Sequence, residues 1–233
     1  MKVIFAGPSL PDAADFVAAD IRILPPAIQG DVLRAVQQGA TVIGLIDGGF
    51  EYTAPVWHKE ILFALSQGVT VFGASSMGAL RAAECETYGM IGVGEIFRTY
   101  QSGELVDDAE VALLHAPPEL GGGALTLPMA NIRATLDALS KSGRLSPEDA
   151  GALLAASAAI HFKERTWGRI FASRDMKPDN LAALMADHYI DRKRLDAIEL
   201  VALVNDAPDK KGAFPKAWSF VETTLWEKMK RHL

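Results

Sequence analysis

The sequence contains almost no cysteine. Cys85 is the single cysteine among 233 residues, so the chain cannot form an internal disulfide framework of the kind that small secreted proteins use. No segment is long and apolar enough to span a bilayer, and the apolar run at the N-terminus is too short for a signal peptide. We therefore expect a cytoplasmic protein that does not insert into a membrane.

The chain also lacks an excess of positive charge. Its net charge of −6 argues against non-specific binding to nucleic acids or anionic membranes. The five histidines are scattered, without the HxxH or CxxC spacing of metal ligands, so no metal is expected. Neither a complete GxGxxG motif nor a GxxxxGKS motif occurs, and we expect no cofactor.

What the first half of the sequence does contain is an alternation of short apolar strands and helices. Strands are predicted at residues 3–6, 21–24, 41–46 and 69–72, and helices at about 11–19, 30–39 and 55–68. This alternation predicts an α/β fold, with a mostly parallel sheet and flanking helices in a Rossmann-like N-terminal core.

The second half has a different character. A loop is expected at residues 89–94, a short helix at 95–101 and an additional strand at 111–114. From residue 128 onward almost every segment is typical of a helix, with starts at about 128, 147, 167, 179, 191 and 215. We therefore expect two domains, an α/β core over residues 1–125 and a helical extension over residues 126–233 that packs on the core.

Three of the predicted strands end in glycine-containing turns. These turns are Gly7-Pro8-Ser9, Asp47-Gly48-Gly49 and the stretch from Gly73 to Gly78. Because ligands bind at the carboxyl ends of strands in open parallel sheets, we expect the three turns to be neighbours and to form a site. Ser9, Gly48 and Gly49 are candidate substrate-binding or oxyanion-binding residues there.

The third turn joins a strand directly to a helix and carries Ser75 and Ser76. The first N–H groups of a helix, together with its dipole, favour negative charge at such a point. The segment is similar to a nucleophile elbow centred on Ser76, with Gly78 two residues later but Ala74 where the usual pattern has glycine. Alternatively, one serine merely caps the helix, since serine is a preferred N-cap residue.

A serine nucleophile needs a base, and Lys59 on the preceding helix is the candidate. It falls between Leu62 and Phe63 on the helical wheel, at the edge of the apolar stripe. A lysine that is partly desolvated has a lowered pKa, and its neutral amine can accept a serine proton. Alternatively, the side chain of Lys59 simply extends along the surface.

The residues around the turn have candidate roles too. The backbone N–H groups of Met77 and Gly78 are candidates for stabilising an oxyanion. Arg81 lies three residues before Glu84, which predicts a local ion pair, although Arg81 can also face an incoming carboxylate. Cys85 is expected to be a small buried residue and not a nucleophile.

At this point the motifs converge, and the chain resembles the TfuA-like proteins. The resemblance covers roughly the first 100 residues. It is carried by FAGPSL (Phe5 to Leu10), IDGGF (Ile46 to Phe50), VWHKEILFAL (Val56 to Leu65), FGASSMGALRAAE (Phe72 to Glu84) and YGMIGVGEIF (Tyr88 to Phe97).

The resemblance implies a partner of YcaO enzymes, which activate backbone amides of a peptide or protein substrate for thioamidation. It further implies hydrolysis of a thiocarboxylated ThiS-like sulfur-carrier protein by a Ser–Lys pair, which corresponds here to Ser76 and Lys59, with Ser75 as the rival nucleophile. A non-catalytic adaptor that recruits substrate to YcaO is the alternative function. Phosphate binding at the three glycine turns is a third.

Overall fold

The computed structural model describes residues 1–49, 51–174, 178–212 and 218–232. They form two compact units: unit 1 comprises Met1–Val106 together with Arg194–Leu233, and unit 2 comprises Asp107–Lys193. Within the described ranges, no helix has both the length and the apolar character needed to cross a membrane.

Unit 1 is built on a five-stranded sheet, which confirms the predicted α/β class. Its strands lie in the order β2-β1-β3-β4-β5 and every neighbouring pair is parallel. Most of these strands are buried on both faces, as their continuous apolar sequences require. The strands are β1 (Lys2–Phe5), β2 (Ile21–Leu24), β3 (Val42–Leu45), β4 (Thr70–Ala74) and β5 (Ile91–Val93).

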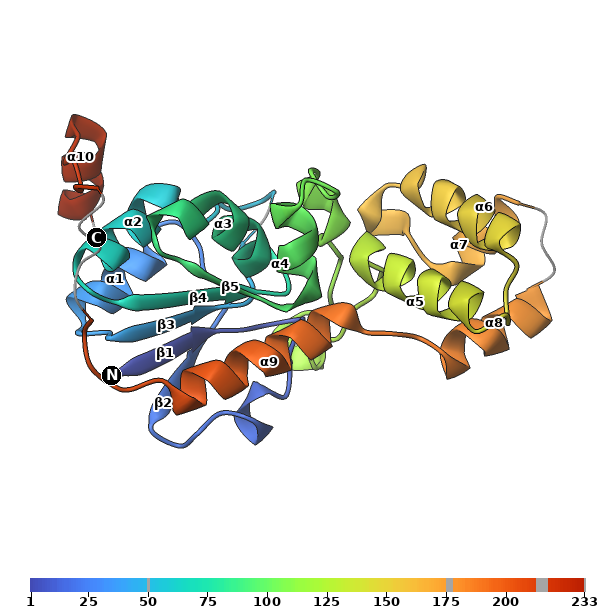
Figure 1. Cartoon of the computed structure of the whole chain (residues 1–233), viewed down its shortest axis with the longest axis horizontal. Helices are drawn as coiled ribbons and strands as arrows, with labels where there is room; N and C mark the ends of the chain where they lie inside the picture. Colours follow the sequence, from blue (N-terminus) through green and yellow to red (C-terminus); the bar gives the residue numbers. More distant parts are fainter. Residues whose placement is uncertain (50, 175–177, 213–217, 233) are drawn as a thin grey trace. The chain divides into compact units, whose positions relative to one another are not determined.

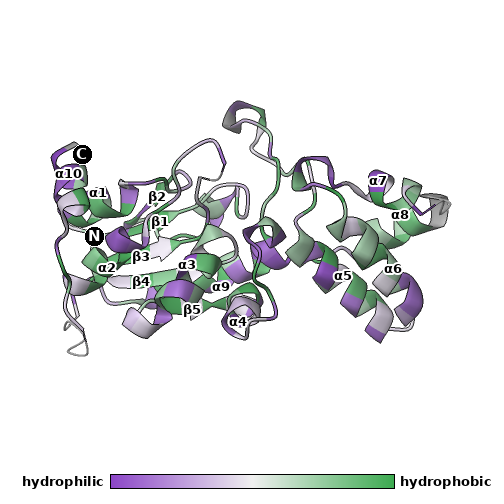
Figure 2. Ribbon diagram, turned by 90° about the horizontal axis from the view of Figure 1, so that it is seen from above, coloured by the Kyte–Doolittle hydropathy of each residue, from purple (hydrophilic) through white to green (hydrophobic). Residues whose placement is uncertain are grey.

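Helices cover both faces of this sheet (Figure 1). α1 (Asp31–Gln37), α2 (His58–Ser66) and α3 (Met77–Cys85) lie along one face, and α9 (Arg192–Asp206), which belongs to unit 1 from Arg194 onward, lies along the other. Figure 2 shows the central strands as hydrophobic, whereas the helices carry both hydrophobic and hydrophilic residues. The helices are therefore amphipathic and bury one side each against the sheet.

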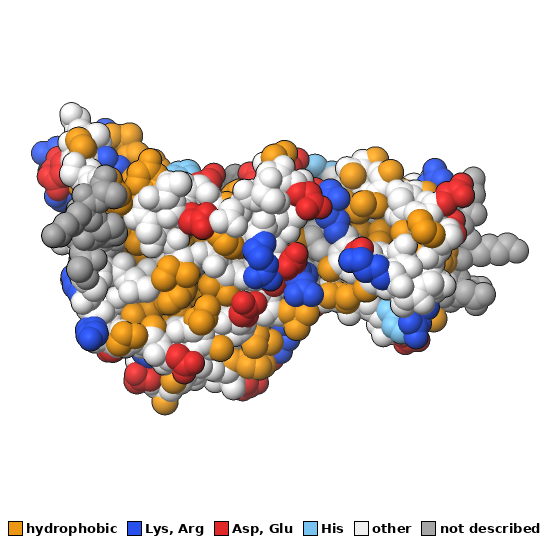
Figure 3. All heavy atoms as spheres, viewed as in Figure 1, with side chains coloured by type: hydrophobic (Ala, Val, Ile, Leu, Met, Phe, Trp, Pro, Cys, Tyr) orange, Lys and Arg blue, Asp and Glu red, His pale blue; other side chains and the backbone are white. Residues whose placement is uncertain are grey.

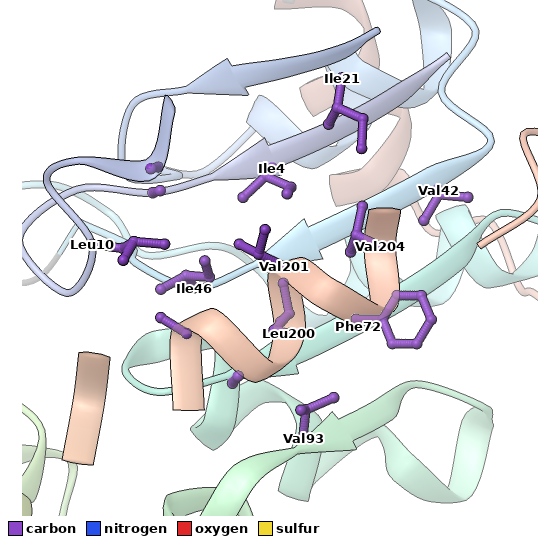
Figure 4. Packing of buried hydrophobic residues seen from close by; sticks show 14 residues of the cluster. Ile4, Leu10, Ile21, Val42, Ile46, Phe72, Val93, Leu200, Val201 and Val204 are labelled. Carbon is purple, nitrogen blue, oxygen red and sulfur yellow. The ribbon is translucent and has the colours of Figure 1, made fainter. Parts of the chain in front are cut away.

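The face beneath α9 contains a tightly packed apolar cluster (Figure 4). Leu200, Val201 and Val204 of α9 pack with strand residues that include Ile4 and Val42, all buried. Gly44 in β3 makes this approach possible, because a Cβ atom there would lie 2.8 Å from a Leu200 methyl carbon. A side chain at position 44 would push α9 away from the sheet.

Lys2 binds the C-terminal end of α9. Its ammonium is buried and donates to the carbonyls of Val204, Asn205 and Ala207 at 3.0, 2.8 and 3.2 Å. The last carbonyls of a helix lack intrahelical partners, and a cation there also interacts favourably with the helix dipole.

Three expectations from the sequence are wrong. The loop expected at residues 89–94 contains β5, in which Gly92 leaves room for the Phe97 ring. The helix expected at 11–19 is only a 3₁₀ turn, Ala13–Asp15, because Asn205 of α9 binds the backbone of Phe16 and Ala18 instead. The strand expected at 111–114 is irregular backbone followed by one isolated bridge between His115 and Ala124.

Unit 2 is helical around its own core. Ile132, Leu136, Leu153, Ile170 and Phe171 are buried together there. Its helices are α5 (Met129–Lys141), α6 (Pro147–Ala158), α7 (Trp167–Ala172) and α8 (Pro178–Asp187).

The remaining helices belong to unit 1. α4 spans Gly94–Gln101, and α10 spans Thr224–His232. The helix start expected near residue 215 falls outside the described residues. In the face shown in Figure 3, acidic and basic side chains are intermixed.

Candidate active site

The three glycine-containing turns lie at one edge of the sheet, which confirms that they are neighbours. β1, β3 and β4 are consecutive and parallel, so their carboxyl ends meet there. Strand order also changes direction between β1 and β3, and open α/β sheets bind ligands at such a switch point. This edge is therefore the candidate active site.

Asp47 ties the first two turns together. Its buried carboxylate accepts hydrogen bonds from the Gly7 N–H at 2.8 Å, the Ser9 N–H at 3.1 Å and the Ser9 hydroxyl at 2.6 Å. Three donors offset the cost of burying a carboxylate. Ser9, a candidate for substrate binding, thus has its hydroxyl engaged by Asp47. Sequence reasoning does not assign Asp47 this role; the only signal is an acid directly after a buried strand.

Gly48 and Gly49 differ in what their N–H groups do. The Gly49 N–H donates to the Ala27 carbonyl at 2.8 Å, whereas the Gly48 N–H has no protein acceptor in the described part of the chain. Gly48 also lies against Met77, because a Cβ atom at residue 48 would come within 2.7 Å of the Met77 Cγ. Gly48 therefore brings an unused N–H group close to the start of α3.

Met77 is the first residue of α3, and its N–H group is also unused. Among the described residues it has no protein acceptor. The Gly78 N–H, by contrast, donates to the Ile46 carbonyl at 3.1 Å. Of the candidate oxyanion donors, Gly48 and Met77 are thus the two whose N–H groups remain available for a ligand.

Ser75 forms the sharp turn between β4 and α3. Its φ of 69° lies in the left-handed region, and the Ser76 N–H donates to the Ala74 carbonyl across it at 2.7 Å. Ser75 is fully buried, and its hydroxyl has no hydrogen-bond partner within the described structure. Strain and an unsatisfied buried hydroxyl at one residue are both costly, and such costs concentrate at functional sites.

Ser76 follows as the N-cap residue of α3, but its hydroxyl makes no capping hydrogen bond. Its carbonyl accepts from the Ala79 N–H at 3.0 Å and from the Leu80 N–H at 3.3 Å. The alternative in which this serine caps the helix through its side chain is therefore not what the structure contains. Ser76 is half-buried and so more accessible than Ser75.

Glycines press the start of α3 onto the sheet. A Cβ atom on Gly78 would overlap the Leu45 carbonyl oxygen of β3, and one on Gly73 would overlap the Gly78 carbonyl oxygen. Neither contact can be relieved by a side-chain rotation, because both partners are backbone atoms. The turn therefore depends on glycine at 73 and 78, as a tight strand-to-helix elbow does.

Lys59 directs its ammonium to the C-terminal part of unit 1. The Nζ atom donates to the Val221 carbonyl and lies 4.7 Å from the centre of the Phe220 ring. Among the described residues, no hydrogen bond joins Lys59 to Ser75 or Ser76. The candidate Ser–Lys pair thus stays a prediction, with the ammonium engaged by the C-terminal segment in this structure.

Arg81 is engaged within a small polar cluster between α2 and α3. Its Nε donates to the Val56 carbonyl at 2.8 Å, and its Nη1 donates to Glu84 at 2.7 Å, which confirms the expected ion pair. His58 also bonds Glu84 at 2.7 Å, a contact that sequence reasoning misses because it joins two helices. Burial alone would raise the pKa of Glu84, but the His58 hydrogen bond and the Arg81 charge outweigh it and lower that pKa.

Cys85 is not a nucleophile in this arrangement. It is 1% exposed, and burial, with the nearby Glu84 charge adding to it, raises the pKa of its thiol to about 12. Across the described ranges, no group of three or more His, Cys, Asp or Glu side chains could hold a metal ion. The chemistry available at this edge is that of hydroxyls and backbone N–H groups.

Comparison with known proteins identifies the family. The family model described as TfuA-like protein matches residues 47–166, more than half of the chain. The match includes α2 and the turn from Gly73 to Gly78, here called the serine turn. It begins after the FAGPSL motif and continues beyond the first 100 residues into unit 2. No curated protein matches the chain. The chain therefore belongs to the TfuA-like family, which at the level of the family takes part with YcaO in thioamidation.

Proposed function

We propose that the chain hydrolyses the C-terminal thiocarboxylate of a ThiS-like sulfur-carrier protein and so supplies sulfide for YcaO-dependent thioamidation. The observation that supports this most is the strained serine turn beside the unused N–H groups of Gly48 and Met77. A serine hydroxyl next to preorganised N–H donors suits acyl transfer. A thiocarboxylate is an anion, which the N-terminus of α3 favours.

In the proposed reaction Ser76 is the nucleophile and Lys59 accepts its proton. The serine oxygen attacks the thiocarboxylate carbon, the C–S bond breaks, and sulfide leaves as HS⁻ with the proton that Lys59 returns. Water then hydrolyses the serine ester, which restores Ser76 and leaves a carboxylate on the carrier. The N–H groups of Gly48 and Met77 stabilise the oxyanion, and each such donor contributes about 3 to 4 kcal/mol.

The choice between the two serines rests on opposing properties. Ser76 is half-buried and can meet a carrier tail, whereas Ser75 is fully buried. Ser75, however, has the positive φ and the unpartnered hydroxyl. We place the nucleophile at Ser76 because attack requires contact with the substrate carbonyl, and Ser75 is the rival that an experiment must test.

The test measures sulfide release from thiocarboxylated carrier by purified variants. Ser76→Ala and Lys59→Ala are each expected to lower the rate at least about a hundredfold, because nucleophile and base act as a unit. Ser102→Ala, a surface substitution in α4's C-cap, is the matched control and should leave the rate unchanged. Loss of activity in Ser75→Ala with normal activity in Ser76→Ala would move the nucleophile to Ser75. Unchanged release in both serine variants would exclude the hydrolase.

A non-catalytic adaptor is the second candidate, favoured by the engagement of Lys59 with Val221 and Phe220. The two functions separate when free sulfide is supplied to YcaO and its substrate in place of the carrier. A hydrolase becomes unnecessary under that condition, so adding the chain should not accelerate thioamidation. An adaptor still raises the rate, and it does so equally with the Ser76→Ala and Lys59→Ala variants.

A further inference from the structure

The C-terminal residues 218–232, here called the C-terminal cover, pack on α2 through an aromatic cluster. Trp226 of α10 is completely buried, and its ring centre lies 5.0 Å from that of Phe63, 6.5 Å from that of Trp57 and 5.2 Å from that of Phe220. The Phe220 ring in turn meets Phe63 at 5.5 Å. The cover is thus anchored by aromatic rings, which contribute through both buried area and ring geometry.

Lys59 lies between this aromatic cluster and the cover backbone. It is one helical turn before Phe63 on α2, so both side chains project from the same side of the helix. The ammonium donates to Val221 and sits over the Phe220 ring, and both contacts suit a positively charged group. A lysine held in this way is engaged as a donor and does not serve as a base for the serine turn.

Outside the aromatic cluster the cover is attached through Trp218, whose indole N–H donates to the Tyr88 carbonyl at 3.1 Å and whose ring meets the Tyr88 ring. Val221 and Leu225 are 61% and 62% exposed, although both are large and apolar. The ion pairs of Lys230 with Glu222 and Glu227, both at 3.0 Å, lie within the cover and do not attach it to α2. A terminal segment that leaves large apolar side chains in water opens at lower free-energy cost than the central sheet.

We propose that the C-terminal cover is an autoinhibitory segment: while seated on α2 it engages the Lys59 ammonium, and its release frees Lys59 to act as the base for the serine. This proposal rests on the proposed function, because it assigns regulation to the same Ser–Lys site. It also makes a claim independent of catalysis, namely that residues 220 and 221 shield the Lys59 amine.

The first test measures that shielding without any substrate. The full chain is treated with an amine-acylating reagent, and labelling of Lys59 is followed by mass spectrometry, with exposed Lys141 of unit 2 as the internal reference. Phe220→Ala and Trp226→Ala should each raise the labelling rate of Lys59 relative to Lys141 by about tenfold. Lys230→Ala, which breaks only ion pairs inside the cover, should leave that ratio unchanged. An unchanged ratio in both aromatic variants would overturn the proposal.

The second test measures sulfide release from thiocarboxylated carrier. Phe220→Ala should release sulfide faster than the unaltered chain, and the gain should vanish in Phe220→Ala combined with Lys59→Ala. Higher labelling without faster release would refute autoinhibition while leaving the hydrolase intact. If no variant releases sulfide, while labelling still finds Lys59 shielded only when the cover is intact, the proposed function is refuted instead. Thermal unfolding of each variant verifies that the fold is kept, and Phe220→Ala, which retains Trp226, is the milder change.

Discussion

Gly78 illustrates how one residue constrains the serine turn. Its Cα touches the backbone of β3 so closely that a methyl group there would overlap the Leu45 carbonyl oxygen, and its N–H donates to the Ile46 carbonyl. The glycine in the elbow-like sequence is therefore explained by packing of helix against strand. The position of Ser76 and the N–H of Met77 both depend on that close approach.

The same substitution at two glycines should have opposite effects. Gly78→Ala is expected to destabilise unit 1 by at least about 2 kcal/mol, because the backbone must shift to admit the methyl group. Gly151→Ala, in the middle of α6 with open space around its Cα, should stabilise its helix by up to about 1 kcal/mol. Urea unfolding of both variants measures the two effects. This account of the turn would be contradicted if Gly78→Ala lowered the free energy of unfolding less than Gly151→Ala does.

The next scale is that of the helices, and Glu60 connects two of them. Its buried carboxylate accepts from the Trp57 N–H at the start of α2 and from the Leu33 N–H in the first turn of α1, both at 3.2 Å. Burial raises the pKa of Glu60, although these N–H groups work in the opposite direction. One carboxylate thus satisfies orphan donors of two helices and holds their starts together.

This raised pKa makes a prediction about pH. As the pH rises above 4.5, the ordinary pKa of a glutamate, Glu60 loses its proton in the unfolded chain but keeps it in the folded chain. The folded state then binds more protons than the unfolded state, so its free energy of unfolding decreases until the pH passes the raised pKa. The unfolding free energy of the unaltered chain minus that of Glu60→Gln should therefore fall as the pH rises above 4.5 and should become constant above the raised pKa. Urea unfolding across that range measures it. The surface variant Glu104→Gln is the control, and a difference that rises with pH would refute the argument.

For the whole molecule, the main feature is that unit 1 is discontinuous in sequence. Residues 194–206 return after unit 2 and cover the sheet face that the 3₁₀ turn Ala13–Asp15 and the rest of the β1–β2 connection leave open. The Arg194 guanidinium also pairs with Asp12 at 2.5 and 2.6 Å, which joins α9 to that connection. The Rossmann-like core is therefore completed by a segment almost 200 residues from its first strand.

Two leucines on α9 should differ sharply if this helix completes the core. Leu200 is fully buried against the sheet, whereas Leu203 is 42% exposed. Leu200→Ala should destabilise unit 1 by about 2 to 5 kcal/mol through lost burial and a cavity. Leu203→Ala should cost clearly less, because much of its side chain already contacts water. Equal losses in denaturant unfolding would mean that α9 does not pack on the sheet as described.

Much of the candidate site was predictable from the sequence because it is encoded locally. The strand-turn-helix pattern at residues 69–84, the parallel α/β class and the meeting of three glycine turns all follow from periodicity and small residues. The ion pair of Arg81 with Glu84 follows from spacing along one helix. β5 was missed because the glycines in residues 89–94 are typical of a loop, and only pairing with β4 makes residues 91–93 a strand.

What the sequence by itself determined is the set of local elements and the small residues that allow the serine turn, since these depend on contacts between near neighbours. Only the tertiary structure decided which polar groups are engaged. Asp47 holds Ser9, Glu84 holds His58, and Val221 holds Lys59. Each of these partners comes from another element or from far along the chain, where spacing and periodicity carry no information. The physical reason is that packing chooses the partners of long polar side chains only after the elements have assembled.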